Sequence, residues 1–376
     1  MRALRLHLQR AALVVLGVVA ALALGEAAAR LLVPTDSVSE LRGLHEFRPD
    51  RGWLYGLRPG AEGRLSETGE ALYRINPDGF RGPRHARPRP AGGIRVVVIG
   101  DSIAFGYAVD EAAAFPRVLE TRLAALVPQA GVEVVNLGVG GYNAWNEAEL
   151  LKDVGVGYQP DLVLAQFCIN DLNDPSVHFD AQTRLLLSTI PDAAFPNPSL
   201  RRGPRHAPSR ILAWCAASRL CALARDRWLA ARSVEFDDEA KRAAVVPVGS
   251  EDGPEWRWLE ARYLEMATAA ERAGARFAVL AFPYPAQLAG RGQDPVQERL
   301  LALARRHGWT VIDPLPAFRT AHAAGAVLFL DWWHPTEIGH RIAADETLRV
   351  LACTGELGEQ ARDACPGLGA GRAAGG

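Results

Sequence analysis

Residues Ile94–Gly106 read IRVVVIGDSIAFG, and this stretch decides how the rest of the chain is interpreted. Its β-branched run, Val96–Ile99, ends abruptly at Gly100, which is typical of a buried parallel strand followed by a sharp turn. A side chain just beyond such a strand lies at the carboxyl edge of the sheet, where open α/β sheets bind their ligands. Ser102 is therefore a candidate nucleophile, although the same tripeptide would also suit an ordinary turn with a capping serine.

Beyond this stretch, apolar runs and helical periodicities alternate along the chain. We expect strands at residues 94–99, 132–137, 162–167, 277–282 and 309–312. We expect helices at residues 114–126, 144–154, 254–273, 294–307 and 336–351, and one more at 209–232 inside a Pro- and Arg-rich insertion. This alternation predicts an α/β fold built on a doubly wound parallel sheet of about five strands.

A base and a carboxylate stand close together near the end of the predicted sheet domain. Acyl transfer by serine needs a base within hydrogen-bond reach of the hydroxyl, and the base needs a carboxylate to orient it. Asp331 and His334 are three residues apart, just before a predicted helix, so one turn can supply both groups. A helix-capping aspartate beside a solvated histidine would show the same spacing, so the rest of the chain has to decide between the two readings.

Three groups are candidates for an oxyanion hole, which needs hydrogen-bond donors fixed in advance. They are the backbone N–H of Ser102, the backbone N–H of Gly141 and the side-chain amide of Asn170. Gly141 follows the second predicted strand and Asn170 follows the third, so both belong to the same sheet edge as Ser102. Each could be only a turn residue, but all these elements together, in this order, favour an acyl-transfer site.

Four short blocks resemble those of the SGNH (GDSL-like) hydrolases, and the resemblance extends over residues 94–351. The blocks are Gly100–Ser102, Gly138–Gly141, Asn170–Asp171 and Asp331–His334. The resemblance implies a flavodoxin-like sheet and no metal or other cofactor. It also implies Ser102 as nucleophile, His334 as its base and Asp331 as the partner of that base.

Two positions depart from the pattern of that family. Ile103 stands where the nucleophile block usually has leucine, which is a conservative change. Cys168 stands where the asparagine block usually begins with glycine, and a side chain there would narrow the pocket or reposition Asn170. Because a buried cysteine behaves mostly as a small apolar group, we expect Cys168 to be a packed thiol and not a reactive one.

The N-terminus has the pattern of a targeting segment. Arginines at positions 2, 5 and 10 precede an apolar run at residues 11–24, as in a signal peptide or signal anchor. Small residues at Ala27–Ala29 offer a cleavage site for secretion, but the apolar stretch continues beyond them to Val33. We therefore interpret residues 1–33 as an anchor in the cytoplasmic (inner) membrane, with the catalytic domain in the periplasm or outside the cell.

The N-terminal half also resembles membrane-anchored bacterial members of the same family. The resemblance rests on Gly52-Trp53, on Pro59-Gly60 and on the segment Ile75–Arg81, which reads INPDGFR. Aromatic residues and Gly/Pro turns alternate here, so we expect residues 34–93 to form a small β-rich preface and a linker. We assign residues 94–352 to the hydrolase domain, with the insertion at 172–253, and residues 353–376 to a C-terminal tail.

Charge and cysteine content narrow the choice of partners. Lys+Arg number 42 and Asp+Glu 43, and this net charge of −1 gives no electrostatic case for a nucleic-acid partner. The chain has five cysteines, so at least one is free unless it bridges two molecules, and none has zinc-site spacing. In an oxidising compartment Cys353 and Cys365 could close a small loop, or they could be two unrelated thiols.

These observations lead to one main hypothesis and two alternatives. The main hypothesis is a serine esterase that hydrolyses a small-molecule or glycan ester outside the cytoplasmic membrane. The first alternative is an O-acyltransferase that passes the acyl group to an envelope polysaccharide, with the same residues. The second is a non-catalytic carbohydrate-binding protein, in which Trp53, Trp332 and Trp333 would stack on sugars. Neither the acyl group nor the alcohol follows from the sequence.

Overall fold

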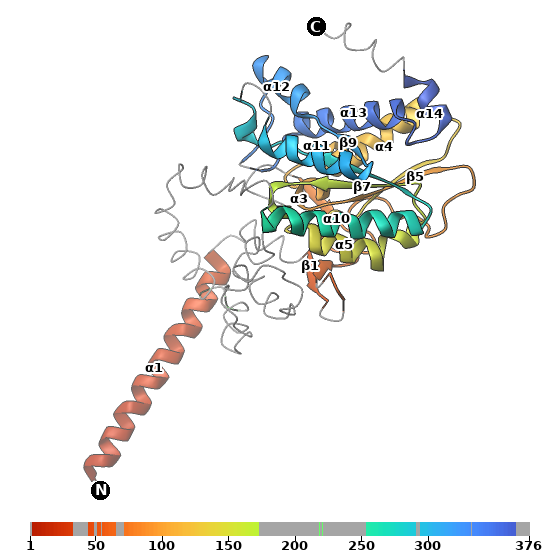
Figure 1. Cartoon of the computed structure of the whole chain (residues 1–376). Coiled ribbons are helices and arrows are strands. Elements are labelled where there is room, and N and C mark those ends of the chain that lie inside the picture. The colour runs from red at the N-terminus through yellow and green to blue at the C-terminus, as the bar shows by residue number, and fades with distance from the viewer. Residues whose placement is uncertain are drawn as a thin grey trace.

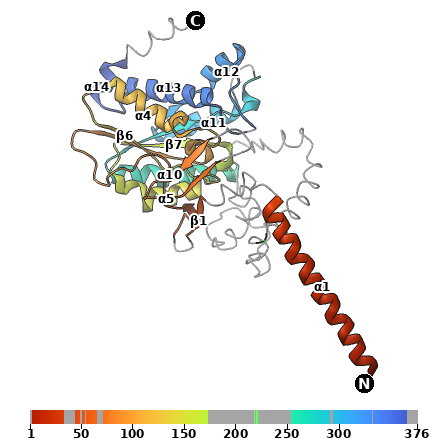
Figure 2. The same cartoon turned by 180° about the vertical axis from the view of Figure 1, so that it is seen from behind.

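The computed structural model describes residues 2–32, 44–48, 51–53, 55–64, 71–172, 218, 220, 253–290, 294–331 and 333–365. The predicted insertion at 172–253 and its helix at 209–232 lie almost entirely outside the described residues. A long helix, α1 (Arg2–Leu32), projects from a body in which helices flank a central sheet (Figures 1 and 2). The candidate site residues all belong to this body.

Within the described residues, the central sheet has five parallel strands. They are β5 (Ile94–Ile99), β6 (Val132–Asn136), β7 (Leu162–Phe167), β8 (Arg276–Ala281) and β9 (Thr310–Ile312). Their spatial order is β6-β5-β7-β8-β9, which is the 2-1-3-4-5 order of flavodoxin-like sheets when the strands are counted along the chain. The prediction of a doubly wound parallel sheet is therefore confirmed, with each strand within one residue of its expected position.

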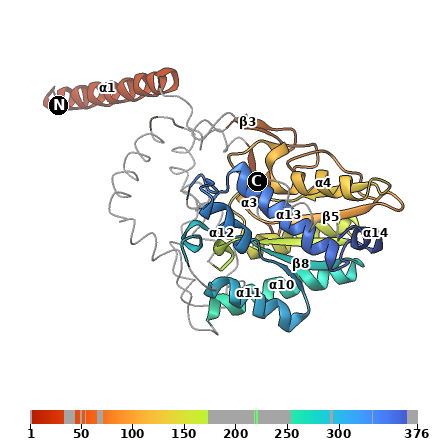
Figure 3. The ribbon, with the colours of Figure 1, turned by 90° about the horizontal axis from the view of Figure 1, so that it is seen from above.

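Helices cover both faces of this sheet. In chain order they are α3 (Ser102–Phe105), α4 (Phe115–Leu126), α5 (Ala144–Asp153), α10 (Pro254–Arg272), α11 (Pro295–His307), α12 (Leu315–Ala323), α13 (Glu337–Cys353) and α14 (Glu359–Asp363). Helices α4 and α13 pack together on one face, and α5 packs on α10 on the other (Figures 1 and 3). The five helices expected around the sheet are all present, whereas α12 and α14 were not predicted because nine and five residues give little periodicity.

Burial explains why the strands read as continuous apolar runs. Every residue of β7 is buried, and in β5 all residues after Ile94 are buried, because helices lie on both sides. Arg95, inside β5, is also fully buried, and it bonds to Glu133 of β6 and to the backbone carbonyls of Arg87 and Tyr158. One charged side chain is therefore buried in the core at the amino end of the sheet, with hydrogen-bond partners for its guanidinium.

Within the described residues, the preface contains two antiparallel strand pairs that pack on the main body. Strands β1 (His45–Phe47) and β2 (Tyr55–Leu57) form one, and β3 (Glu62–Arg64) and β4 (Leu72–Arg74) form the other. Buried preface side chains belong to the same apolar core as the central sheet. Trp53 is buried too, and its indole N–H donates to Asp153 of α5 at 2.8 Å, so it fastens the preface to α5. Trp332 lies outside the described residues.

The chain beyond α13 folds back onto the body. A disulfide joins Cys353 to Cys365, which decides between the two readings of this cysteine pair. Leu357 and Ala361, which lie inside the loop that the disulfide closes, are buried in the main core. This part of the segment 353–376 is thus anchored to α13, both covalently and by apolar packing.

Helix α1 is long and apolar enough to cross a membrane between Ala12 and Leu31, judged by length and composition. Most of its large apolar side chains are exposed, among them Leu13, Leu16 and Leu24. An apolar helix that does not pack into the protein core is typical of a membrane anchor or a signal sequence.

Gly138, two residues beyond β6, packs closely against the turn that carries Ser102. A Cβ atom at Gly138 would lie 2.3 Å from the backbone nitrogen of Phe105 and 2.6 Å from the carbonyl carbon of Ala104. Because backbone atoms cannot move aside easily, we expect Gly138→Ala to lower the free energy of unfolding by about 1–3 kcal/mol or more. Urea denaturation of the purified protein measures this value.

The matched control is Gly131→Ala. Gly131 is exposed, and nothing lies within 4 Å of a Cβ atom added there. We expect this variant to unfold at the same urea concentration as the parent or at a slightly higher one, since alanine restricts the unfolded chain. Equal stability of the two variants would contradict the proposed packing at Gly138.

Candidate active site

Ser102 is placed by a turn that two side chains hold in shape. Asp101 precedes α3, and its carboxylate accepts a hydrogen bond from the backbone N–H of Ile103 at 2.8 Å. Gln166 of β7 reaches across from the neighbouring strand, and its amide oxygen accepts from the N–H groups of Asp101 and Ala104 at 3.4 and 3.1 Å. The first turn of α3 is therefore tied to the sheet, with the Ser102 side chain partly exposed at the carboxyl edge of β5.

A second tight loop presents His334 to the same edge. The Asp331 carboxylate accepts from the backbone N–H groups of Trp333 and His334 at 2.8 and 2.7 Å. The N–H of Leu330 donates to the carbonyl of His334 at 2.8 Å, and this bond closes the loop. Because the same carboxylate both shapes the loop and contacts the imidazole, the orientation of the ring follows from the local fold.

The two loops meet. Nε2 of His334 lies 2.9 Å from Oγ of Ser102, although 232 residues separate them along the chain. On the other side of the ring, Nδ1 lies 2.7 Å from the second carboxylate oxygen of Asp331. With the proton on Nδ1, Nε2 has the free lone pair that can accept the serine proton. The hydroxyl, the imidazole and the carboxylate are thus connected in the order that serine acyl transfer requires.

The electrostatics of Asp331 suit this arrangement. Partial burial by itself would raise the pKa of the carboxyl, but the hydrogen bonds from the His334 ring and from two backbone N–H groups outweigh it. The pKa of Asp331 therefore lies below its ordinary value, and the group is ionised at neutral pH. An ionised partner stabilises the imidazolium that forms when His334 takes a proton.

Helix α13 is held against α4 by His340, which lies six residues beyond His334 in the chain. Nδ1 of His340 accepts the backbone N–H of Phe115, at the start of α4, at 3.2 Å. Burial, with the nearby charges of Arg81 and His334, lowers the pKa of His340 to about 3. The ring is therefore neutral and keeps the lone pair that this contact uses, so the first turn of α13 is joined to the start of α4.

The three candidate oxyanion donors come from the start of α3, from the loop between β6 and α5, and from the short turn after β7. Ser102 is the first residue of α3, and Gly141 lies in the loop between β6 and α5 with a φ of +82°. That φ is in the left-handed region, which favours glycine and so accounts for the residue type. Asn170 belongs to a short 3₁₀ turn, η3 (Ile169–Leu172), but its side chain lies outside the described part of the structure. The oxyanion hole therefore stays a prediction.

Sequence reasoning missed one aromatic side chain at the site. The ring of Tyr107 lies against the imidazole of His334, with ring centroids 4.0 Å apart and planes 30° from parallel. Tyr107 follows the nucleophile block by five residues, and no spacing rule distinguishes it from other aromatic residues of the chain. Only the meeting of the two loops reveals the contact.

Three acidic side chains are buried beneath the site. Asp101, Glu147 of α5 and Asp171 of η3 are each no more than 1% exposed. Within the described residues, the Glu147 carboxyl has no hydrogen-bond partner, whereas Asp171 accepts from the N–H of Cys168 and the hydroxyl of Tyr263. Burial and mutual repulsion raise the pKa values of Glu147 and Asp171 well above their ordinary range. Cys168 itself is buried, as expected for a packed thiol.

Comparison with known proteins places the chain in a family. The sequence model of the GDSL-like Lipase/Acylhydrolase family matches residues 98–342, which is more than half of the chain. The chain belongs to this family. The matched range includes both loops of the site, and the hydrolase is accordingly an enzyme that acts on ester bonds. No curated protein matches the chain.

Solved structures similar to this hydrolase include an α/β hydrolase, a lipolytic protein and an acetylxylan esterase. An α/β hydrolase enzyme from the metagenome of Lake Arreo is 19% identical, with 72% of this chain and 99% of that chain covered and a TM-score of 0.41. A lipolytic G-D-S-L family protein of Veillonella parvula is 15% identical, with 69% of this chain and 98% of that chain covered and a TM-score of 0.40. An acetylxylan esterase of Geobacillus stearothermophilus is 17% identical, with 72% of this chain and 97% of that chain covered and a TM-score of 0.40. The family assignment rests on the family match alone.

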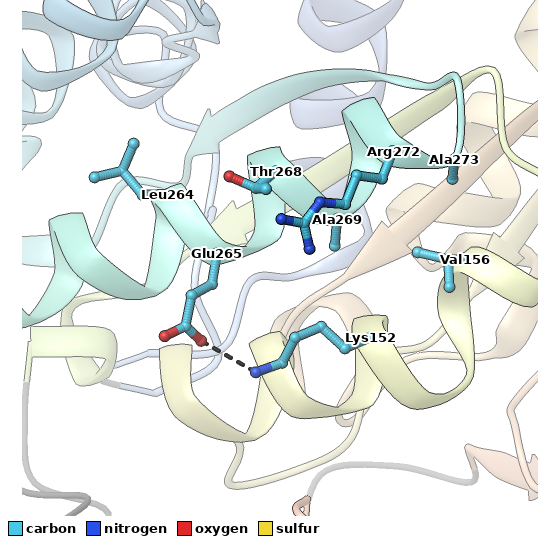
Figure 4. A pocket seen from close by; sticks show the side chains of 8 residues that line it. All are labelled: Lys152, Val156, Leu264, Glu265, Thr268, Ala269, Arg272 and Ala273. Atoms are coloured by element: carbon cyan, nitrogen blue, oxygen red, sulfur yellow. Dashed lines mark hydrogen bonds and ion pairs between the residues drawn. The ribbon is translucent and has the colours of Figure 1, made fainter.

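A groove of about 730 Å³ lies between α5 and α10, away from the two loops (Figure 4). Lys152 of α5 bridges it to Glu265 of α10 at 3.1 Å, and Arg272 lines it near the end of α10. Both helices run back from the carboxyl edge of the sheet, so Lys152 and Arg272 mark the opposite edge from Ser102.

Glu147 makes the stability of this hydrolase depend on pH. Its pKa in the folded protein lies above the unfolded value of about 4.5, so ionisation at higher pH favours the unfolded chain. With Glu147 protonated, the free energy of unfolding keeps its full value below about pH 4.5. It falls as the pH rises through the pKa that Glu147 has in the folded protein. We expect Glu147→Gln, which cannot ionise, to raise the unfolding temperature at pH 8 more than at pH 5.

Thermal unfolding at the two pH values checks this expectation. Glu149→Gln is the matched control, because Glu149 lies on the same helix but is partly exposed and pairs with Lys152. We expect no pH-dependent gain from that variant. A gain for Glu147→Gln that is equal at pH 5 and pH 8 would rule out ionisation of Glu147 as its cause.

Proposed function

We propose that the protein is a serine esterase in which Ser102, His334 and Asp331 form a catalytic triad. The observation that carries this proposal is the 2.9 Å contact between His334 Nε2 and Ser102 Oγ, continued by the 2.7 Å contact from His334 Nδ1 to Asp331. Both distances are within the range in which a general base can act directly. Family membership supports the same chemistry.

The reaction follows from these contacts. Ser102 Oγ attacks the ester carbonyl while His334 Nε2 takes the serine proton, and Asp331 stabilises the resulting imidazolium. The tetrahedral intermediate collapses when His334 returns that proton to the leaving alcohol, and an acyl-enzyme remains on Ser102. Water, deprotonated by His334, then attacks the acyl carbonyl. His334 returns that proton to Ser102 Oγ as the acyl–oxygen bond breaks, so the acid leaves and the free hydroxyl is restored. The substrate we propose is a small-molecule or glycan ester.

Backbone and side-chain donors would stabilise the negative oxygen of the intermediate. We assign this role to the N–H groups of Ser102 and Gly141 and to the Asn170 amide. The left-handed backbone at Gly141 and the fixed first turn of α3 support the assignment, because preorganised donors lose no energy to rearrangement when charge develops.

We also propose that α1 holds the hydrolase at the outer face of the cytoplasmic membrane. Positive residues before an apolar helix orient that helix with its N-terminus in the cytoplasm. The disulfide between Cys353 and Cys365 supports an oxidising compartment for the body of the protein. Residues 1–33 are then the anchor, 34–93 the preface and linker, 94–352 the catalytic domain and 353–376 a disulfide-tethered tail.

The triad is tested with Ser102→Ala and His334→Ala on 4-nitrophenyl acetate. We expect either change to lower kcat by at least about 10⁴-fold, and Asp331→Asn to cost less, because the carboxylate acts only through the histidine. A fluorophosphonate probe should label the parent protein and fail to label Ser102→Ala, as read by mass spectrometry.

Thr121→Ala and His322→Ala are the controls, since both side chains are exposed on the surfaces of helices and neither belongs to the proposed triad or oxyanion hole. We expect these variants to keep the parental kcat. Full turnover by folded Ser102→Ala would remove the proposed mechanism.

The anchor is tested by cell fractionation. We expect the full chain to stay with the membranes after an alkaline carbonate wash, and a variant lacking residues 1–33 to be soluble, because burial of about 20 apolar residues in lipid is effectively irreversible. Intact mass separates an uncleaved anchor from cleavage near Ala27–Ala29. Full chain that is both uncleaved and soluble would contradict membrane insertion.

A further inference from the structure

Arg81, in the preface, is a buried cation with no role in the chemistry described above. Only 2% of its surface is exposed, and its guanidinium donates to backbone carbonyls. Nη1 bonds to the carbonyls of Phe105 and Gly106 at 3.0 and 2.5 Å, and Nη2 bonds to that of Val109 at 2.7 Å. These three carbonyls belong to the end of α3 and to the turn that follows it, so a preface side chain contacts the element that begins with Ser102.

Those carbonyls need a partner that the helix itself cannot supply. A helix of four residues leaves its last C=O groups without intrahelical donors, and at a buried position each such group must find one elsewhere. A guanidinium presents several N–H donors in a fixed planar fork, which suits several carbonyls at once better than an ammonium group does. Arg81 therefore caps the carboxyl end of α3.

A second preface residue holds the same turn. The hydroxyl of Tyr73, in β4, accepts the backbone N–H of Ala108 at 2.6 Å, and its ring stacks on Phe105 with centroids 5.1 Å apart. The Arg81 guanidinium lies over the same Tyr73 ring, 4.4 Å from its centroid. Ala108 has a φ of +61°, a conformation that costs a non-glycine residue about 1–2 kcal/mol. Such a conformation persists only where its surroundings enforce it.

The turn held in this way reaches both halves of the triad. The N–H groups of Gly106 and Tyr107 donate to the carbonyl of Ser102 at 3.1 and 2.9 Å, so the turn is fastened to the nucleophile. Tyr107, between Gly106 and Ala108, lays its ring against the imidazole of His334. A shift of the turn would therefore move Ser102 and His334 relative to each other.

We propose that Arg81 is a positioning residue for the nucleophile, and that the preface is thereby a working part of the catalytic site. Arg81 touches no reacting atom. It acts through the turn at residues 105–109, which sets the distance from Ser102 to His334. This inference rests on the proposed triad, and it assigns a purpose to the segment Ile75–Arg81 that the triad leaves unexplained.

Burial does not remove the charge of Arg81. It lowers the pKa of the guanidinium to about 10, with Tyr73, Glu111 and Asp110 acting in the opposite direction, so the group stays protonated at pH 7. A charged donor makes stronger hydrogen bonds to the carbonyls than a neutral one would. Replacement by an apolar side chain of similar length would remove the guanidinium donors from the buried carbonyls of Phe105, Gly106 and Val109.

Arg81→Met and Arg81→Lys, in the full chain, test the proposal. For Arg81→Met we expect kcat on 4-nitrophenyl acetate to fall about 10- to 100-fold, because a displacement of about 1 Å at a reacting group has an effect of this size. The KM should change by less than about threefold, since no substrate contact is lost. The rate of fluorophosphonate labelling should fall in parallel with kcat, and Arg81→Lys should recover part of both.

Arg95→Met is the matched control, because Arg95 is also fully buried and also bonds to backbone carbonyls, but at the opposite edge of the sheet. We expect it to lower the unfolding temperature at least as much as Arg81→Met, with kcat within about twofold of the parent value, since distant sites act independently. Tyr73→Phe, which removes only the hydroxyl that receives the Ala108 N–H, serves if Arg81→Met does not fold. It should lower kcat about three- to tenfold at unchanged KM.

The outcomes separate the two proposals. Parental kcat in Arg81→Met, or parental kcat in Tyr73→Phe where only that variant folds, overturns the positioning role while Ser102→Ala remains inactive. Equal losses of kcat in Arg81→Met and Arg95→Met would also overturn it, because general destabilisation would then explain both. Full activity of Ser102→Ala would instead overturn the triad.

Discussion

The hydrogen bond between Ser102 and His334 is the constraint on which the rest of the structure depends. Its two ends are 232 residues apart, and they leave the sheet from strands that are not neighbours. Ser102 follows β5, whereas His334 comes after β9, at the far edge of the order β6-β5-β7-β8-β9. The contact therefore requires the chain after β9 to return across one face of the sheet. Helix α13, which begins three residues after His334, packs on α4 and holds the chain on that face.

Several features around the Ser102 and His334 loops lower the local stability of the protein. Gly138 and the turn at Ala104 and Phe105 approach so closely that no side chain fits between them. Burial raises the pKa values of Glu147 and Asp171, and repulsion adds to it: from Asp171 and Asp101 at Glu147, and from Asp101 at Asp171. His340 is kept neutral by burial so that it can join α13 to α4. Local strain and buried polar groups of this kind are found mainly around functional sites.

The preface gives the hydrolase a second support for the turn that carries Ser102, the proposed nucleophile. The central sheet holds the start of α3 through Gln166, and the preface holds its end through Arg81. Since α3 has only four residues, its few backbone hydrogen bonds do not by themselves keep Ser102 in place. A short helix fixed at both ends by other elements is a physically reasonable way to hold a nucleophile within reach of its base.

Much of the fold could be predicted because its strands are buried on both faces. The unbroken apolar runs of β5 and β7, and the periodicity of α4 and α10, are local properties that appear directly in the residue order. The residue types at Ser102, Asp331 and His334, with their places after predicted strands, likewise suggested the candidate site before any contact was known.

The tertiary structure alone decided which distant groups meet, because contacts between remote segments leave no periodic trace in a sequence. Tyr107 against His334, Arg81 on the carbonyls after α3, and His340 on the N–H of Phe115 depend on strand order and helix packing. The short helices α12 and α14 were missed for a related reason, since tertiary packing and not intrinsic periodicity stabilises them. The residue order thus determined the elements and the candidate chemistry, and the packing of those elements determined the geometry of the site.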